Sequence, residues 1–132
     1  MVVHINYLAV LVAAILNMAI GALWYSPLLF ARPWMRLTGR KMGEGNAGLG
    51  YALAALCSLV TAYVLAHFIS LVNANSFGTG AATGFWAWLG FVATAFAASF
   101  AFEGRPSRLF GIVTGYSLVS LVLMGGLLGA WQ

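Results

Sequence analysis

The sequence predicts an all-α membrane protein: four transmembrane helices in one antiparallel helical bundle, forming a single domain over residues 1–132. Hydrophobic residues make up 63% of the chain and charged residues only 6%. A soluble domain of this size could not bury so much apolar surface. Four apolar runs each reach the ~20 residues that a spanning helix needs. All charged residues lie in two short segments between these runs.

The first span is predicted over residues 5–30. Trp24 and Tyr25 mark its end, because amphipathic aromatic side chains favour the membrane interface. Pro27 then disfavours a regular helix through Ser26. We therefore expect Trp24, Tyr25 and Pro27 to form a corner that turns the chain into a basic loop.

The basic loop carries Arg32, Arg36 and Arg40 at four-residue spacing. This pattern favours a short helix that lies in the headgroup region after Pro33, with Arg32 and Arg36 reaching lipid phosphates. A solvated basic loop that only obeys the topology rule explains the pattern equally well. A specific site for a lipid headgroup or small anion at this corner is a further alternative.

The second, third and fourth spans are predicted over residues 49–72, 79–102 and 109–131. The short uncharged segment 73–78 is rich in turn-forming residues and fits a tight helical hairpin. Gly104 and Pro106 are placed to end the third span and to start the fourth. Consecutive spans are therefore expected to be antiparallel neighbours.

The distribution of the six Lys and Arg residues predicts the orientation. All six lie in the first and third loops, which share one side in a four-span chain. The positive-inside rule places these loops in the cytoplasm and both termini outside. Membrane lipids are then the expected anionic partner, because nucleic-acid binding needs a basic surface on a soluble fold.

Small residues predict how the helices associate, since in lipid they allow close packing of backbones. The second span has a row at four-residue spacing, formed by Gly50, Ala54, Ser58, Ala62 and Ala66. The later spans carry the GxxxG pairs Gly80 and Gly84, Gly111 and Gly115, and Gly125 and Gly129. One bundle needs fewer such faces, which favours a homo-oligomer or association with other membrane proteins.

Asn17 lies near the middle of the first span, where its amide needs partners that lipid cannot supply. The structural interpretation is an interhelical hydrogen bond, with candidate partners Thr61, Thr94, Ser117 and Ser120. The alternative is a ligand site or ion path.

His67 is predicted about one helical turn from the outer end of the second span, and His4 precedes the first span on that side. Two histidines without further ligands make a poor metal or haem site. We expect His67 to face headgroups or to form a hydrogen bond.

The sequence shows no enzymatic pattern. No nucleophile has a histidine and a carboxylate on its side of the membrane, and no cofactor motif occurs, so neither a cofactor nor a metal is expected. No carboxylate lies inside a span, which disfavours proton-coupled export. The leading hypothesis is a non-enzymatic structural, accessory or self-associating membrane subunit. The alternative is a small oligomeric channel or carrier with a polar path that includes Asn17.

Several segments of the chain form a recognisable set. The first is Gly21-Ala22-Leu23-Trp24-Tyr25-Ser26-Pro27-Leu28-Leu29-Phe30, followed by Trp34-Met35. Others are Gly84-Phe85, Trp88-Leu89-Gly90-Phe91, Phe102-Glu103-Gly104-Arg105-Pro106, Met124-Gly125 and Trp131. Together these segments resemble a family of small four-span bacterial membrane proteins classified as domain of unknown function 1761. The resemblance implies four spans and a bacterial inner-membrane location. It implies no activity.

Overall fold

The computed structural model describes residues 3–40 and 46–132, which are helical and contain no strand. The elements are α1 (Tyr7–Trp24), α2 (Ala31–Thr38), α3 (Ala47–Leu71), α4 (Phe77–Ala87), η1 (Trp88–Ala93), α5 (Thr94–Glu103) and α6 (Ser107–Ala130). The π-helical segment η1 joins α4 and α5 into one continuous helix. With α1, α3 and α6, this makes four helices long and apolar enough to cross a membrane. The predicted fold class is confirmed.

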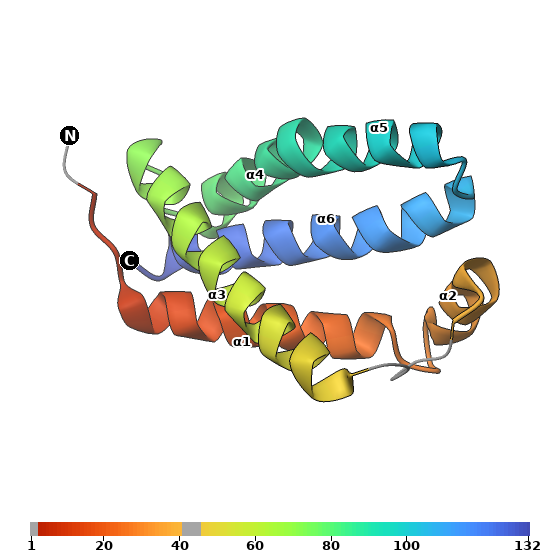
Figure 1. The fold of residues 1–132 in the computed structure, drawn as a ribbon. Coiled ribbons are helices and arrows are strands. Elements are labelled where there is room, and N and C mark those ends of the chain that lie inside the picture. The colour runs from red at the N-terminus through yellow and green to blue at the C-terminus, as the bar shows by residue number, and fades with distance from the viewer. Residues whose placement is uncertain (1–2, 41–45) are drawn as a thin grey trace.

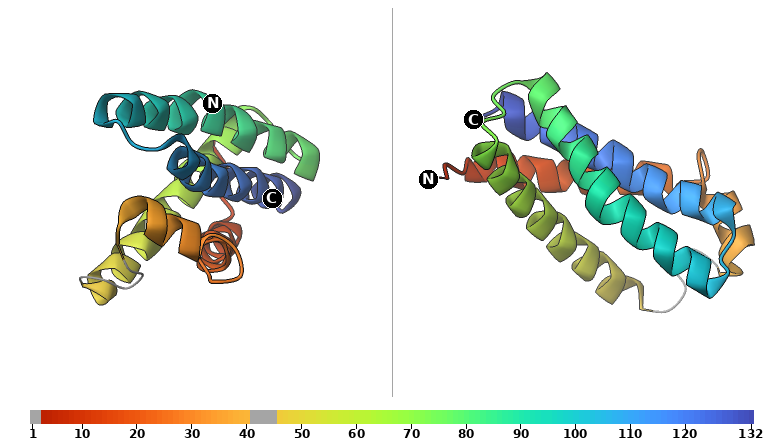
Figure 2. Two further views of the ribbon diagram at one scale, coloured as in Figure 1. Left: turned by 90° about the vertical axis from the view of Figure 1, so that its right-hand side faces the viewer. Right: turned by 90° about the horizontal axis from the view of Figure 1, so that it is seen from above.

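Helix α6 lies at the centre of the bundle and contacts every other helical segment. The first described residues and the C-terminus lie at one end, and α2 and the α5–α6 connection lie at the other (Figure 1). Helix α3 crosses α1 obliquely, so that its first turns diverge from the rest of the bundle (Figure 2). One part of α3 therefore packs inside the protein while another part does not.

The helix ends follow from local sequence. Asn6, Asn46 and Ser76 are N-caps whose side-chain oxygens accept hydrogen bonds from backbone N–H groups of the first turn. Gly39 and Gly104 end α2 and α5 with φ values of 72° and 66°, a left-handed conformation that glycine adopts without strain. The predicted role of Gly104 is therefore confirmed.

The predicted boundaries hold for three spans within two residues, but the first helix is shorter than expected. It ends at Trp24 rather than near Phe30. Pro27 favours a turn, and backbone hydrogen bonds fold the chain back, with the Phe30 N–H donating to the Trp24 carbonyl at 3.0 Å. Helix α2 also begins before Pro33 rather than after it. A proline is tolerated there because the first N–H groups of a helix have no partner within it.

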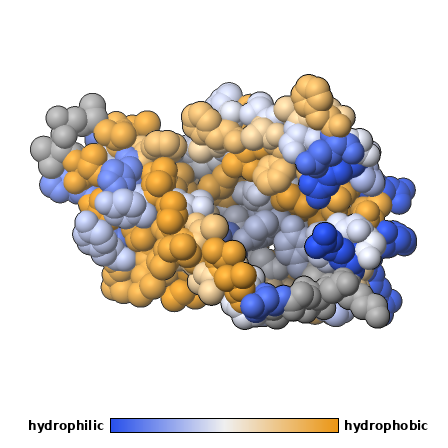
Figure 3. All heavy atoms as spheres, in the orientation of Figure 1, coloured by the Kyte–Doolittle hydropathy of each residue, from blue (hydrophilic) through white to orange (hydrophobic). Residues whose placement is uncertain are grey.

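The molecule has an apolar body with hydrophilic residues concentrated at the α2 end (Figure 3). Large exposed hydrophobic side chains occur along α1, α3 and α4–α5, as expected for helices that face lipid. The described charged residues belong to the α2 end, namely Arg32, Arg36, Arg40, Glu103, Arg105 and Arg108. Lys41 and Glu44 lie outside the described residues. The two basic segments thus share one end of the bundle.

Candidate functional site

The closest helix contact joins α4 and α6 through glycines. A methyl group added at Gly80 would overlap the carbonyl oxygen of Gly125, and one added at Gly84 would overlap that of Leu121. A methyl group at Gly129 would lie 3.0 Å from the Cα of Gly80. We call this set of residues the glycine contact. Two of the predicted GxxxG pairs therefore meet each other within one chain.

The third GxxxG pair does not bring two helix backbones into direct contact. A methyl group at Gly115 would lie 3.1 Å from the Trp24 ring, so this glycine makes room for an indole. No atom lies within 4 Å of the position that a methyl group at Gly111 would occupy. Gly111 therefore has no helix-packing partner among the described residues, and its predicted packing role with another chain stays a prediction.

The small-residue row of α3 is divided into two parts. Ser58, Ala62 and Ala66 are buried, with 3%, 0% and 7% of their surfaces exposed, and the two alanines belong to the same buried cluster as the alanines of α1. Gly50 and Ala54 are exposed. Apart from the backbone of α3 itself, no atom of the described residues lies within 4 Å of a methyl group placed on Gly50. Three of the five residues of the predicted row are therefore buried inside the protein, and two are not.

Asn17 is the centre of a hydrogen-bonded group that links three helices. Its Nδ2 donates to Ser58 Oγ on α3 at 2.7 Å. Its Oδ1 accepts from the Tyr116 hydroxyl at 2.7 Å and from Ser120 Oγ at 2.5 Å, both on α6. Ser58 and Ser120 are almost completely buried. We call these four residues the Asn17 cluster.

The structure brings together only one of the predicted pairs, Asn17 and Ser120. Thr94 and Ser117 instead donate to carbonyls one turn earlier in their own helices, and Thr61 lines a groove between α3 and the continuous α4–α5 helix. Tyr116 was missed as a partner. It lies one turn before Ser120 on the same face of α6, a spacing that pointed to a shared contact.

The chemistry of the Asn17 cluster is limited to hydrogen bonding. Its members are one amide and three hydroxyl groups, with neither a carboxylate nor an imidazole to exchange a proton near neutral pH. Two donors already occupy the acceptor positions of Asn17 Oδ1. Five surface cavities of about 260 to 480 Å³ in the described part of the chain are lined by other residues. The cluster therefore suits helix association.

The corner after α1 is attached to α6 by Trp24. Its indole N–H donates to the carbonyl oxygen of Ile112 at 2.8 Å. Its ring also lies beside that of Phe30, with centroids 4.7 Å apart and the ring planes tilted by 36°. Pro27 lies between these two aromatic residues in the sequence. The contact between the two rings therefore holds the turn against the end of α1.

Tyr25 occupies the inside of this corner. Its ring lies between those of Trp34, at 6.3 Å, and Tyr116, at 5.7 Å. Burial and the neighbouring Tyr116 phenol raise the pKa of Tyr25 to about 12. Tyr25 therefore remains neutral at physiological pH, as its apolar surroundings require.

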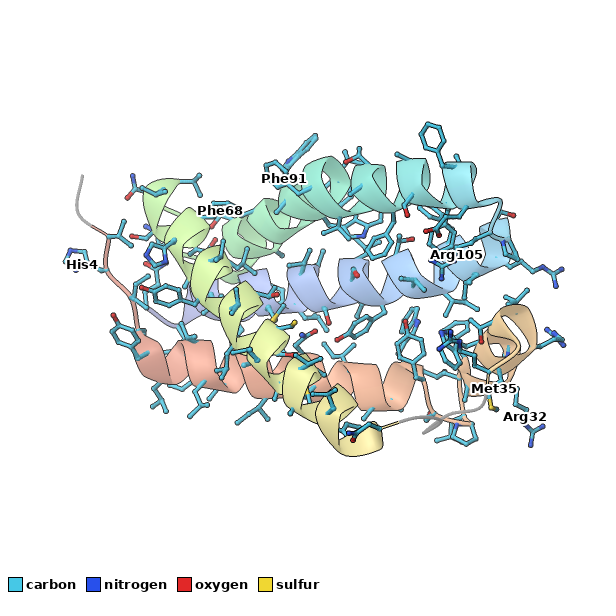
Figure 4. The ribbon with its side chains drawn as sticks, viewed as in Figure 1. His4, Arg32, Met35, Phe68, Phe91 and Arg105 are labelled. Carbon is cyan, nitrogen blue, oxygen red and sulfur yellow. The ribbon has the colours of Figure 1, made fainter. Side chains whose placement is uncertain are left out.

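The two histidines are not part of the Asn17 cluster. His67 Nδ1 lies 3.0 Å from the Tyr63 carbonyl oxygen in its own helix. His4 lies at the end opposite α2 (Figure 4) and lines a cavity of about 420 Å³ whose lining does not include His67. Among residues 3–40 and 46–132, no three His, Cys, Asp or Glu side chains are grouped to hold a metal.

Comparisons with known sequences point to a family but not to an activity. A search of curated proteins and a search of solved structures gave no match. A family model matches residues 8–129, which covers the four candidate spans except for one residue at each outer end, together with the α2 corner. The chain therefore belongs to the family described as protein of unknown function (DUF1761).

Proposed function

We propose that the protein is a non-enzymatic helical subunit of the bacterial inner membrane that associates with other membrane helices, and in the first place with copies of itself. The divided small-residue row of α3 carries this proposal. Its buried half already serves as a helix-packing surface within the chain. Its other half offers the same type of surface to the outside.

The open half has the residues that a second helix requires. Gly50 and Ala54 are exposed, and Cys57 is an exposed free cysteine seven residues after Gly50. Residues at this spacing share one face of a helix. We call Gly50, Ala54 and Cys57 the open α3 face. A second copy carries an identical face, so two protomers can pair about a twofold axis with close backbone approach.

The Asn17 cluster supports a subunit over the alternative of an oligomeric channel or carrier. A conduit needs polar groups that are free to contact a passing solute. Both acceptor positions of Asn17 Oδ1 are occupied by hydroxyl groups of α6 from the same chain. Nothing in this arrangement requires a second copy to complete it.

We also propose that the α2 end faces the cytoplasm, with both termini outside. The described basic residues are concentrated at that end, and basic loops are retained on the cytoplasmic side. In a Cys57→Ala background, we expect a cysteine at Ser107 to react with an impermeant thiol reagent only from the cytoplasm. Reaction from outside would show that the orientation is reversed.

Cross-linking of the native cysteine tests self-association. A short bis-maleimide added to membranes containing the full chain is expected to give a covalent dimer through Cys57, and Gly50→Leu is expected to reduce it. Gly50→Leu is suitable because the fold leaves space at this glycine. The matched control is Leu59→Cys in a Cys57→Ala background. Leu59 is also exposed but lies about half a turn around α3.

The control decides between specific pairing and random collision. The proposal requires a much stronger dimer band from Cys57 than from Leu59→Cys. Equal cross-linking from the two positions would show that the open α3 face does not bind a second copy. The same conclusion would follow if neither position cross-links although a monofunctional maleimide labels both thiols under the same conditions.

A further inference from the structure

A cavity at the charged end is lined by two arginines from different elements. Arg36 comes from α2 and Arg108 from the first turn of α6. The cavity has a volume of about 370 Å³. Its remaining lining is apolar and consists of Phe30, Pro33, Leu37, Gly111 and Ile112. Two positively charged side chains thus line an otherwise apolar cavity.

No acidic residue in the described part of the chain pairs with either of these two arginines. Within residues 3–40 and 46–132, the ion pair that forms joins Arg105 to Glu103 at 3.5 Å, and neither Arg36 nor Arg108 takes part in it. Two like charges beside one cavity repel each other and raise the local positive potential. An anion between them removes this repulsion.

We propose that this cavity binds an anionic glycerophospholipid of the cytoplasmic leaflet, with its phosphodiester between Arg36 and Arg108. Guanidinium groups recognise phosphate oxygens through paired, charge-assisted hydrogen bonds. The apolar lining covers the glycerol and the first acyl carbons. This inference rests on the proposed orientation, but it does not depend on self-association.

The open position at Gly111 gives room for the lipid. Apart from the backbone of α6 itself, no atom of the described residues lies within 4 Å of the position that a methyl group at Gly111 would occupy. Gly111 lies three residues beyond Arg108, which is about one helical turn deeper into the membrane. The headgroup and the start of an acyl chain can therefore follow the surface of α6.

A second basic cavity on the other side of α2 fits this role less well. It is lined by Arg40 and Arg105 among other residues. Arg105 already pairs with Glu103, and its guanidinium lies 4.0 Å from the centre of the Phe100 ring. The charge on that side is partly neutralised, so the Arg36–Arg108 cavity is the stronger anion site.

Arg32 provides a matched control for general attraction between the basic end and the membrane. It lies one turn before Arg36 on α2 and is exposed. It lines neither of the two cavities, and its side chain points away from the bundle (Figure 4). Arg32→Gln removes the same charge from the same helix without changing the cavity.

Native mass spectrometry of the purified full chain tests the site, with phosphatidylglycerol, phosphatidylcholine and inorganic phosphate as separate probes. We expect selective binding of phosphatidylglycerol. Arg36→Gln and Arg108→Gln are each expected to weaken it about tenfold, and Arg32→Gln less than about twofold. Gly111→Leu should also weaken it by filling the cavity, with no change in charge.

Three results would overturn the inference. Equal losses for Arg32→Gln and Arg36→Gln would indicate unspecific charge attraction. Binding of inorganic phosphate as strong as that of the lipid would indicate a site for a free anion. Unchanged lipid binding in both Arg36→Gln and Arg108→Gln, with each variant folded by circular dichroism, would show that the cavity is not a lipid site. The Cys57 cross-link is unaffected in each case, so failure here leaves self-association intact.

Discussion

The two main contacts made by α6 hold the bundle by different means. Towards α4, Gly80 and Gly84 bring two backbones into direct contact, with no side chain between them. Towards α1 and α3, the contact includes the Asn17 cluster, in which side chains span the gap. Backbone contact depends on distances that cannot adjust, whereas side chains can change rotamer. The glycine contact should therefore tolerate substitution much less well than the Asn17 cluster.

The largest expected effect is that of Gly84→Ala. A methyl group here overlaps the carbonyl oxygen of Leu121, so α4 and α6 must separate and lose packing along their length. We expect the free energy of unfolding in mixed micelles to fall by about 3 kcal/mol. The matched control is Gly90→Ala in η1 of the same continuous helix, where the added methyl group meets no atom within 4 Å.

The free energies of unfolding of these two variants test whether α4 and α6 are in backbone contact. Gly90→Ala is expected to cause no loss and to raise the free energy of unfolding by up to about 1 kcal/mol, because alanine is the better helix former. If both variants unfold at the same denaturant concentration as the unsubstituted chain, then α4 and α6 are not in backbone contact at these glycines.

A smaller effect is expected for Asn17→Ala. The substitution removes the hydrogen bonds to Ser58, Tyr116 and Ser120, but the serine hydroxyls can turn to carbonyls of their own helices. We expect a loss of about 1 kcal/mol in the free energy of unfolding. The same measurement on Tyr116→Phe, which removes one donor, should give a smaller loss. A loss for Asn17→Ala as large as that for Gly84→Ala would contradict the contrast between the two contacts.

Much of the fold could be predicted because the membrane restricts it. Length and apolarity predicted three of the spans within two residues, and Gly104 and Pro106 stand at the predicted helix ends. The first span was predicted too long, since hydropathy alone does not separate a helix from the apolar turn at Leu28 and Leu29. The turn depends on hydrogen bonds that close around Pro27, such as that from the Phe30 N–H to Trp24.

The pairing of helices was less predictable. Four-residue spacing identified the small-residue faces, but spacing does not say which faces meet or whether they meet within one chain. The oblique crossing of α3 over α1 leaves Gly50 and Ala54 exposed while Ser58 is buried. Similarly, the joint lining of one cavity by Arg36 and Arg108 results from the turn at the corner, which brings α2 against α6. The sequence carries no local signal for either arrangement.

The central claim is that the polar groups inside the membrane hold helices together and do not line a water path. Thiol labelling of Asn17→Cys in a Cys57→Ala background tests this most directly. An impermeant charged reagent is applied from each side, with cysteines at Ser107 and Asn75 as accessible controls for the two ends; both native residues are exposed. We predict that the cysteine at position 17 reacts from neither side and reacts fully after denaturation. Labelling from water in the folded protein would contradict the claim and support a conduit through Asn17.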